Sequence, residues 1–294
     1  DEDEGKLEER IKSSIDRKIE YHSFKEKEII LKKEKRFFSA QFYLWAASVT
    51  LIMGLLSALY FYMNAEPEAL NQVSVAVYNS SKAAFGEKRK LTLQDGTIVY
   101  LNSGSEFRYP DRFSNEKRDV YLTGEAYFQV SKDKTRPFVV HSGAIKTTVL
   151  GTSFNICAFD DQSELSVTVV SGKVKVDLES GSDSKAKTVL LTKNLEARYS
   201  KADQQLTHYR TNANESILWK DNVLNFNNKT LSEIEVILER WFNIEIRIID
   251  DELGEYTYVG KHNNPTMYQI LEALHFSTGI EYEILENEVI LKKK

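Results

Sequence analysis

The chain has 294 residues, of which 41% are hydrophobic and 28% are charged, an ordinary composition for a folded protein. Its formal net charge of −5 excludes the broadly basic surface typical of nucleic-acid-binding proteins. Because Cys157 is the single cysteine, an internal disulfide is excluded and a hydrophobic core has to hold the fold.

Residues 1–36 are predicted to form a charged helical segment. One helix cannot bury its own apolar side. This side therefore requires a partner protein, a second copy of the chain or further residues of the same protein to pack against. The alternative is a solvated, partly frayed helix. The chain begins with Asp1 and not with methionine, and we expect the natural protein to extend upstream. Four apolar residues recur at every fourth position and define the side in question: Leu7, Ile11, Ile15 and Ile19.

Residues 37–63 are predicted to cross a membrane once. The stretch contains no charged side chain, and as a helix it would be about 40 Å long, against about 30 Å for the hydrocarbon core of a bilayer. A buried core helix is the alternative, but such helices are usually shorter and keep a polar side. A cleaved signal peptide would begin earlier and be shorter. Aromatic residues near both ends are expected to anchor the helix at the membrane interfaces: Tyr43, Trp45, Tyr60 and Tyr62.

The residues that flank this span predict its orientation. Glu66 and Glu68 follow the span, and the first basic residue after it is Lys82. Cytoplasmic flanks carry the excess of lysine and arginine, so the N-terminus is predicted to be cytoplasmic and everything after about residue 64 to lie outside the cytoplasm. The basic residues directly before the span are Lys32, Lys33, Lys35 and Arg36.

After a predicted linker at residues 64–84, residues 85–200 are predicted to form an all-β domain. Gln94-Asp95-Gly96-Thr97 is typical of a hairpin turn because glycine adopts the positive φ that tight turns need. Many short strands at this spacing predict a sandwich, a roll or a β-helical stack, with Gly124 at a bend or bulge. The clearest predicted strands are 120–130, 138–141, 147–150, 154–159, 165–170 and 173–178.

A second linker is predicted at residues 201–218, and residues 219–294 contain an internal repeat. Residues 227–250 read NNKTLSEIEVILERWFNIEIRIID, and residues 263–286 read NNPTMYQILEALHFSTGIEYEILE, an offset of 36. Each copy predicts a strand, an amphipathic helix and a second strand. The domain is therefore predicted to consist of two β-α-β repeats, with a last strand at 289–291 pairing with 280–285.

Helix-start signals occupy the same place in both copies of the repeat. Thr230 is followed three residues later by Glu233, and Thr266 is followed by Gln269. A threonine and an acid or amide at this spacing form a capping box, which satisfies the free N–H groups of a first helical turn. Asn243 and Gly279 are expected to end the two helices, because asparagine and glycine tolerate the left-handed conformation found there.

No residue pattern predicts catalysis. None of the five histidines is paired at the short spacings of a zinc site, and there is no phosphate-binding loop. Gly151-Thr-Ser-Phe-Asn155 lacks the second glycine of a nucleophile elbow. The pairs Asp160-Asp161 and Asp250-Asp251 stand beside turn residues and are expected to be solvated. We therefore predict a protein without enzymatic activity, metal or other cofactor.

Four segments of the β region resemble the FecR-type regulators, which are membrane-bound anti-sigma factors of cell-surface signalling, especially their Bacteroidetes branch. The segments are LTLQDGTIVYLNSGSEFRYPDRF (91–113), VYLTGEAYFQVSKDKTRPFVVHSG (120–143), VLGTSFNI (149–156) and VVSGKV (169–174). From about Trp219 the chain resembles the C-terminal domain of that branch, which is similar to the secretin/TonB short N-terminal domain. The resemblance covers roughly residues 85–294.

The resemblance implies a signalling function. It implies an inner-membrane protein that binds an extracytoplasmic-function sigma factor on the cytoplasmic side, without contacting nucleic acid itself. Its periplasmic part would contact the signalling domain of a TonB-dependent outer-membrane transducer, and envelope proteases would then release the sigma factor to transcribe nutrient-uptake genes. The family's cytoplasmic domain has several helices, of which residues 1–36 supply about the last one.

Two other classes of protein remain open from the residues alone. One is a membrane-anchored periplasmic β-sandwich enzyme or glycan-binding module, which predicts a deep polar cleft within residues 88–199. The other is an envelope-assembly protein that uses residues 219–294 as a docking module and forms rings.

Overall fold

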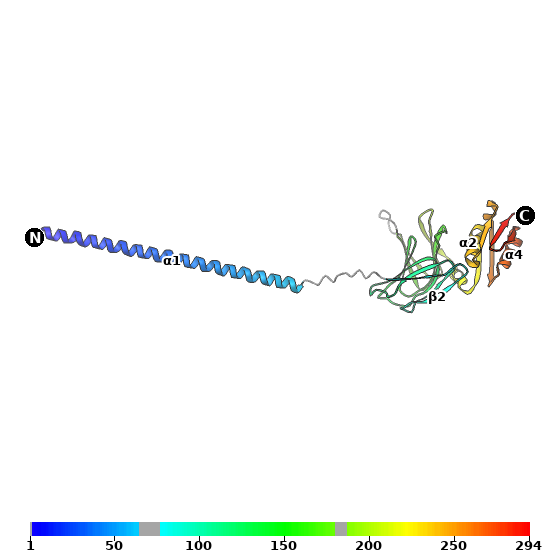
Figure 1. The fold of residues 1–294 in the computed structure, drawn as a ribbon, viewed down its shortest axis with the longest axis horizontal. Helices are drawn as coiled ribbons and strands as arrows, with labels where there is room; N and C mark the ends of the chain where they lie inside the picture. The colour runs from blue at the N-terminus through cyan, green and yellow to red at the C-terminus, as the bar shows by residue number, and fades with distance from the viewer. Residues whose placement is uncertain (1, 65–76, 180–186) are drawn as a thin grey trace. The chain divides into compact units, whose positions relative to one another are not determined.

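The computed structural model describes residues 2–64, 77–179 and 187–294; within the first range it describes the side chains of residues 12–29 and 42–63. The chain divides into two compact units, Asp1–Val75 and Ala76–Lys294 (Figure 1). The side chains of Lys32, Lys33, Lys35 and Arg36 and the predicted linker residues 65–76 lie outside the described residues.

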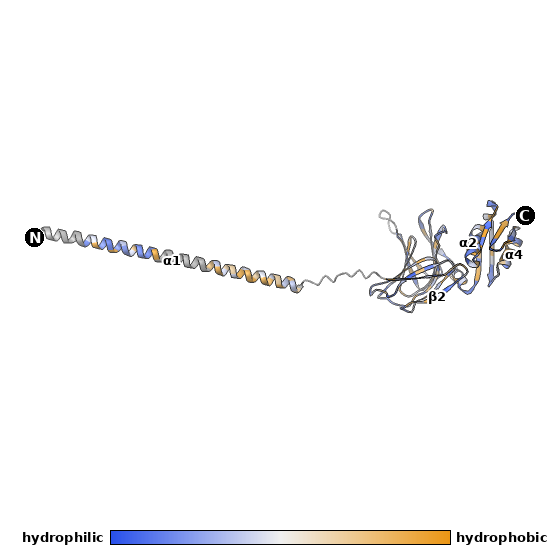
Figure 2. Ribbon diagram, viewed as in Figure 1, coloured by the Kyte–Doolittle hydropathy of each residue, from blue (hydrophilic) through white to orange (hydrophobic). Residues whose placement is uncertain are grey.

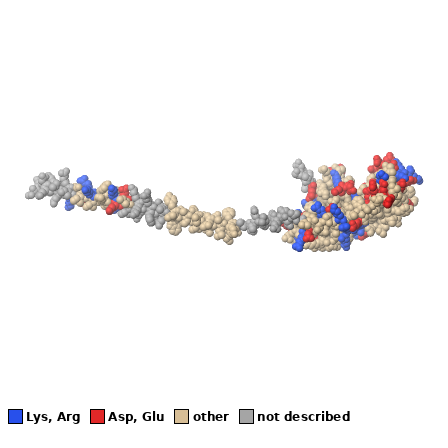
Figure 3. Space-filling view, viewed as in Figure 1, with Lys and Arg blue, Asp and Glu red and all other residues tan. Residues whose placement is uncertain are grey.

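The first unit contains one continuous helix, α1 (Glu2–Asn64). The predicted charged segment and the predicted span are therefore parts of one element. Among the described residues, Phe42–Met63 is long and apolar enough to cross a membrane, and none of it is buried in the rest of the structure. Figure 2 shows mainly apolar residues along this part of α1, and Figure 3 shows no charged residue on its visible face. A core helix would be buried, so the structure does not support that alternative.

The second unit begins with a β domain of strands β1 to β13. Its strands are β1 (Tyr78–Lys82), β2 (Arg89–Thr92), β3 (Ile98–Leu101), β4 (Glu106–Pro110), β5 (Arg118–Gln129), β6 (Phe138–Ser142), β7 (Ile145–Val149), β8 (Ser153–Ala158), β9 (Glu164–Ser171), β10 (Lys173–Leu178), β11 (Thr188–Thr192), β12 (Leu195–Ser200) and β13 (Gln205–Arg210). The mainly β character predicted for this region is confirmed, and each of the six clearest predicted strands is present within three residues of its predicted ends.

The strands form two sheets that share the long strand β5. One sheet has the order β1-β4-β5-β6-β7-β10-β11, and the other has the order β2-β3-β5-β8-β9-β12-β13. Strand β5 pairs with β6 in parallel, and the other pairs in the two sheets are antiparallel. Buried side chains from both sheets meet in one core, which includes Phe107, Phe128 and Phe154. This arrangement is the sandwich or roll among the predicted alternatives.

Gly124 marks the point where β5 passes from one sheet to the other. Residues 118–123 pair with β4 and β6, and residues 124–129 pair with β3 and β8. Gly124 has φ of +100°, and a Cβ at this position would lie 2.4 Å from Ser105 Oγ. Glycine alone fits both the backbone angle and the space. The bend predicted at Gly124 is therefore confirmed.

Two predicted linkers contain strands. Strand β1 lies inside the predicted linker 64–84 and pairs with β4, and β13 lies inside the predicted linker 201–218 and pairs with β12. Each strand buries one side chain, Ser81 in β1 and Leu206 in β13. With one buried residue each, these strands do not show the alternation of apolar and polar residues that predicts a strand. Backbone hydrogen bonds to a neighbouring strand hold them in place instead.

The C-terminal domain follows a 3₁₀ helix and contains both predicted repeats. Its elements are η1 (Glu215–Asp221), β14 (Val223–Thr230), α2 (Leu231–Phe242), β15 (Glu245–Ile248), α3 (Asp251–Gly254), β16 (Thr257–Asn263), α4 (Met267–Thr278), β17 (Glu281–Ile284) and β18 (Glu288–Lys292). Helices α2 and α4 are 12 residues each, and their first residues are separated by the predicted offset. Figure 1 shows them near the C-terminus.

The two strands of each repeat belong to different sheets. Strands β14 and β16 pair with each other, while β15 and β17 lie on opposite sides of β18. Strand β17 pairs with β18 as predicted, and β18 also runs parallel to β15, a pairing that the repeat did not reveal. Apolar residues of both helices fill the core of this domain, among them Leu231 and Leu238 of α2 and Ile270 and Leu274 of α4.

Candidate functional site

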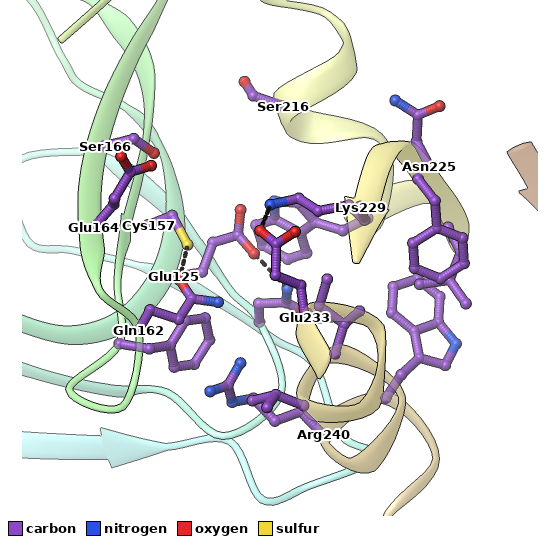
Figure 4. A pocket seen from close by; sticks show the side chains of 18 of the residues that line it. Glu125, Cys157, Gln162, Glu164, Ser166, Ser216, Asn225, Lys229, Glu233 and Arg240 are labelled. Carbon is purple, nitrogen blue, oxygen red and sulfur yellow. Dashed lines mark hydrogen bonds and ion pairs between the residues drawn. The ribbon is translucent and has the colours of Figure 1, made fainter. Parts of the chain in front are cut away.

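A cleft lies inside the second unit, between the β domain and the C-terminal domain. Its volume is about 580 Å³. The β domain contributes side chains from β5, β8 and β9, and the C-terminal domain contributes η1, β14 and α2. Figure 4 shows the side chains of the two domains facing one another across it. The cleft therefore depends on both domains and is not the cleft within residues 88–199 that a β-domain enzyme or glycan-binding module predicts.

Glu125 of β5 forms the centre of a hydrogen-bond network at this junction. Asn102 Nδ2 donates to one carboxylate oxygen at 2.7 Å, and Asn155 Nδ2 donates to the other at 2.8 Å. Trp219 of η1 in turn donates its indole N–H to Asn155 Oδ1 at 3.4 Å. Burial raises the pKa of Glu125, although the two amide donors oppose this effect. The network ties η1 to the middle of the β domain.

Arg240 of α2 connects the two domains directly. It is 6% exposed, its guanidinium lies 3.8 Å from the ring centroid of Phe159, and it forms an ion pair with Asp161. Its backbone carbonyl accepts the N–H of Gly86 at 2.7 Å. A charge, a ring face and a backbone group thus fix α2 against the β domain.

Lys88 makes a second contact across the same junction. Its ammonium lies 3.5 Å from the ring centroid of Trp241 and donates to Asn222 Oδ1 at 2.7 Å. Burial of this ammonium lowers the pKa of Lys88 to about 8, and the negative charge of Glu125 acts in the opposite direction. Trp241, which packs partly buried against the core of the C-terminal domain, therefore also contributes to the domain contact.

Several ionisable side chains of the cleft are paired with one another or protonated. Burial raises the pKa of the Cys157 thiol, which donates to Gln162 at 3.3 Å, so this cysteine is not poised as a nucleophile. Lys229 pairs with Glu233, and Arg198 pairs with Glu164. In the part of the chain that the structure describes, no group of three or more His, Cys, Asp or Glu side chains could hold a metal ion.

Comparison with known proteins identifies the two domains. Residues 79–175 match the family described as FecR protein, and residues 223–291 match FecR, C-terminal. A crystal structure of a candidate anti-sigma factor from Parabacteroides distasonis is 31% identical, with a TM-score of 0.68, and covers 74% of this chain and 99% of its own. A second crystal structure under the same description is 32% identical, with the same TM-score, and covers 74% and 100%. No curated protein matches the chain.

The chain belongs to the FecR family of anti-sigma factors. This confirms the resemblance seen in the sequence. Family membership points to a regulatory protein with a sigma-factor partner. One candidate membrane helix, Phe42–Met63, is consistent with a single-pass membrane protein.

The structure places the remaining predicted site residues of this FecR-family protein in two groups. Tyr43 and Trp45 lie in the first turn of Phe42–Met63, and Tyr60 and Tyr62 lie in its last turn, all four exposed. In the C-terminal domain both capping boxes are present: the Thr230 hydroxyl accepts the N–H of Glu233, and the Thr266 hydroxyl accepts that of Gln269. The sequence missed the junction residues Glu125 and Arg240, because nothing local distinguishes them from solvated charges.

Proposed function

We propose that this protein is an inner-membrane anti-sigma factor that carries a signal across the membrane through α1. Its N-terminal segment would lie in the cytoplasm and sequester an extracytoplasmic-function sigma factor, and residues 76–294 would lie in the periplasm. The observation that carries the proposal is the exposed apolar stretch Phe42–Met63 in a chain whose folded unit belongs to the FecR family.

The charges that flank the span support this orientation. Basic residues at 32–36 precede it, and acidic residues at 66 and 68 follow it, as expected when the N-terminus is cytoplasmic. The aromatic residues at 43, 45, 60 and 62 would then lie at the two lipid–water interfaces, where ring and polar tip are both satisfied. Single cysteines at Lys12 and at Lys201, each introduced into a chain in which Cys157 is replaced by serine, test this topology. A membrane-impermeant thiol reagent added to spheroplasts should label only the second.

The C-terminal domain is proposed as the receiver of the signal. Its sheets have outer edges, and an open edge accepts a strand from a partner through backbone hydrogen bonds. The proposed partner is the signalling domain of a TonB-dependent outer-membrane transducer, with envelope proteases acting afterwards. Arg240 and Trp241 couple this domain to the β domain, so a partner bound to one domain acts on both.

A transcriptional reporter tests the proposed function. Deletion of the gene should change the output of a promoter that depends on the cognate sigma factor, and expression of the full natural protein should restore regulation. A deletion that leaves every such promoter unchanged would contradict the anti-sigma role. A labelling pattern with residues 12 and 201 on the same side would contradict the topology.

A further inference from the structure

The three-stranded sheet of the C-terminal domain has two outer strands, β15 and β17, whose edges differ. Along β15 the outward N–H of Ile246 donates to Glu239 at 3.0 Å, and Glu235 accepts the N–H of Ile248. Both glutamates lie on α2, four residues apart, and so present their carboxylates along one side of the helix. The edge of β15 is therefore capped by the protein's own side chains.

Strand β17 presents an open edge. The N–H of Leu285 donates to Glu288 O at 2.8 Å and closes the hairpin with β18. Because hydrogen-bonded and non-hydrogen-bonded pairs alternate in an antiparallel ladder, the register fixes residues 281 and 283 toward β18 and Tyr282 and Ile284 toward the outside. Among the described residues no side chain caps these two backbone positions; the nearest cap is His275 Nδ1, which bonds to Ile280 O at 2.5 Å.

Apolar side chains are exposed beside this edge. Ile284 is 50% exposed, and on the neighbouring helix α4 Tyr268 is 59% and Phe276 80% exposed. Tyr282 connects the strand to this helix through a hydrogen bond from its hydroxyl to Glu272. The open backbone groups thus stand next to apolar surface that a further strand would cover.

Negative charge predominates in the chain around the edge. From Glu272 to Leu291 the chain contains five glutamates and neither lysine nor arginine, and Lys292 of β18, the next residue, pairs with Glu283 at 3.4 Å. Glu281 and Glu283 lie on the face of β17 opposite the core-facing Tyr282. Figure 3 shows acidic side chains, with basic side chains among them, near the C-terminal end of the visible face. The other open strand, β16, differs: Lys261 lies within it, and its partner β14 is bulged between Phe226 and Lys229, two devices that discourage strand addition.

We propose that the edge of β17 binds one extended strand of a partner protein in which apolar residues alternate with lysine or arginine. The backbone groups of Tyr282 and Ile284 would bond to the partner strand, its apolar residues would cover Tyr268 and Ile284, and its basic residues would face Glu281 and Glu283. This edge would be the contact through which the C-terminal domain receives its signal, so the inference rests on the proposed function.

Peptide binding to the full chain in uncharged detergent micelles tests the edge. The probe is a fluorescent ten-residue peptide of alternating valine and lysine, blocked at both ends, and the comparison peptide has glutamate in place of lysine. Fluorescence anisotropy should report binding of the lysine peptide and at least ten-fold weaker binding of the glutamate peptide. Hydrogen exchange should slow at Tyr282 and Ile284 when the lysine peptide binds.

Proline substitutions isolate the backbone contact. Ile284→Pro removes an N–H that points outward, so the ladder with β18 is kept, and the net charge does not change. Loss of one or two backbone bonds should weaken the peptide by about ten-fold. Val259→Pro, at an exposed position of β16, is the matched control and should bind as the unaltered chain does. Glu281→Lys, which leaves the backbone and the Glu283–Lys292 pair intact, should also weaken binding and guards against misfolding of the proline variant.

Each remaining outcome decides the matter. Equal binding by Ile284→Pro, or loss with Val259→Pro instead, overturns the assignment of β17. Concentration-dependent dimers in sedimentation that Ile284→Pro abolishes would make a second copy the occupant and also overturn it. The reporter assay is independent: a promoter unaffected by gene deletion would contradict the anti-sigma role while leaving the peptide result in place, and absent peptide binding would overturn the docking proposal alone.

Discussion

The ion pair between Arg118 and Asp95 is the most deeply buried charge contact in the described β domain. The Arg118 side chain is fully buried and that of Asp95 is 6% exposed, and Arg118 Nη1 lies 2.6 Å from Asp95 Oδ2. Arg118 also donates to the carbonyls of Ser131 and Arg136. The Arg118 side chain thus joins the β2–β3 turn, strand β5 and the loop after β5. A buried ion pair of this kind is far more sensitive to the loss of one partner than an exposed pair.

Replacing this arginine should destabilise the domain strongly. Arg118→Met leaves the carboxylate of Asp95 buried without its partner, and we expect the free energy of unfolding of residues 76–294 to fall by about 3–5 kcal/mol. Urea denaturation followed by tryptophan fluorescence measures this. The neighbouring Lys117→Met removes only an exposed pair with Asp119 and should cost about 0–1 kcal/mol. Equal losses for the two variants would contradict the importance of the buried pair.

Glu125 predicts a pH dependence of stability. Its pKa is raised in the folded protein, so above the ordinary carboxyl value the folded state binds more protons than the unfolded state, and stability falls as pH rises through the folded pKa. Glu125→Gln does not titrate. The stability of this variant relative to the unaltered protein should therefore increase with pH from about 4.5 upward, as measured by urea denaturation at a series of pH values. A difference that is constant with pH would contradict the raised pKa.

At the scale of elements, the termini of the helices are determined by a few local residues. Thr230 and Thr266 begin α2 and α4 with capping boxes, and Asn243 and Gly279 end them in the left-handed conformation, with φ of 54° and 74°. These features act within one turn of chain, so they can be identified in the sequence. Strands β1 and β13 have no such signal, because what holds them is a neighbouring strand elsewhere in the sequence.

Removing either cap should weaken the C-terminal domain by a similar amount. Thr230→Ala and Thr266→Ala each leave one helical N–H without its acceptor, and each should lower the free energy of unfolding by about 1 kcal/mol. Thermal unfolding followed by circular dichroism measures the loss. Thr278→Ala is the control, because its hydroxyl bonds to the Leu274 carbonyl within the helix and adds little. A loss with Thr278→Ala as large as with the cap variants would contradict the role of the caps.

At the scale of the whole folded unit, Arg240 decides whether the two FecR-family domains move together. It lies nine residues after Leu231, on the side of α2 opposite its apolar face, where charged side chains are usually solvated. The β domain instead buries it against Phe159 and Asp161. Arg240 therefore joins the C-terminal domain to the β domain through side-chain contacts.

Loss of this contact should uncouple the domains. Arg240→Ala removes the ring contact and the packed side-chain stem, and we expect a cost of about 1–2 kcal/mol. Calorimetry should then resolve two transitions where the unaltered residues 76–294 show one, and limited proteolysis should cut faster within residues 211–222. Arg247→Ala, which removes an exposed pair with Glu288, should change neither. A single transition in the Arg240 variant would contradict the coupling.

Features that depend on neighbours along the chain can be predicted from the residues alone. An uncharged apolar stretch, the density of short strands, a repeat with an offset of 36 and its helix caps all follow from local composition and spacing. The folded structure was needed to find the burial of Glu125 and Arg240, the pairing of β1 and β13, and the open edge of the three-stranded sheet. Each of these depends on contacts between residues far apart in sequence, because those contacts determine whether a charged side chain is buried and whether a backbone group has a hydrogen-bond partner.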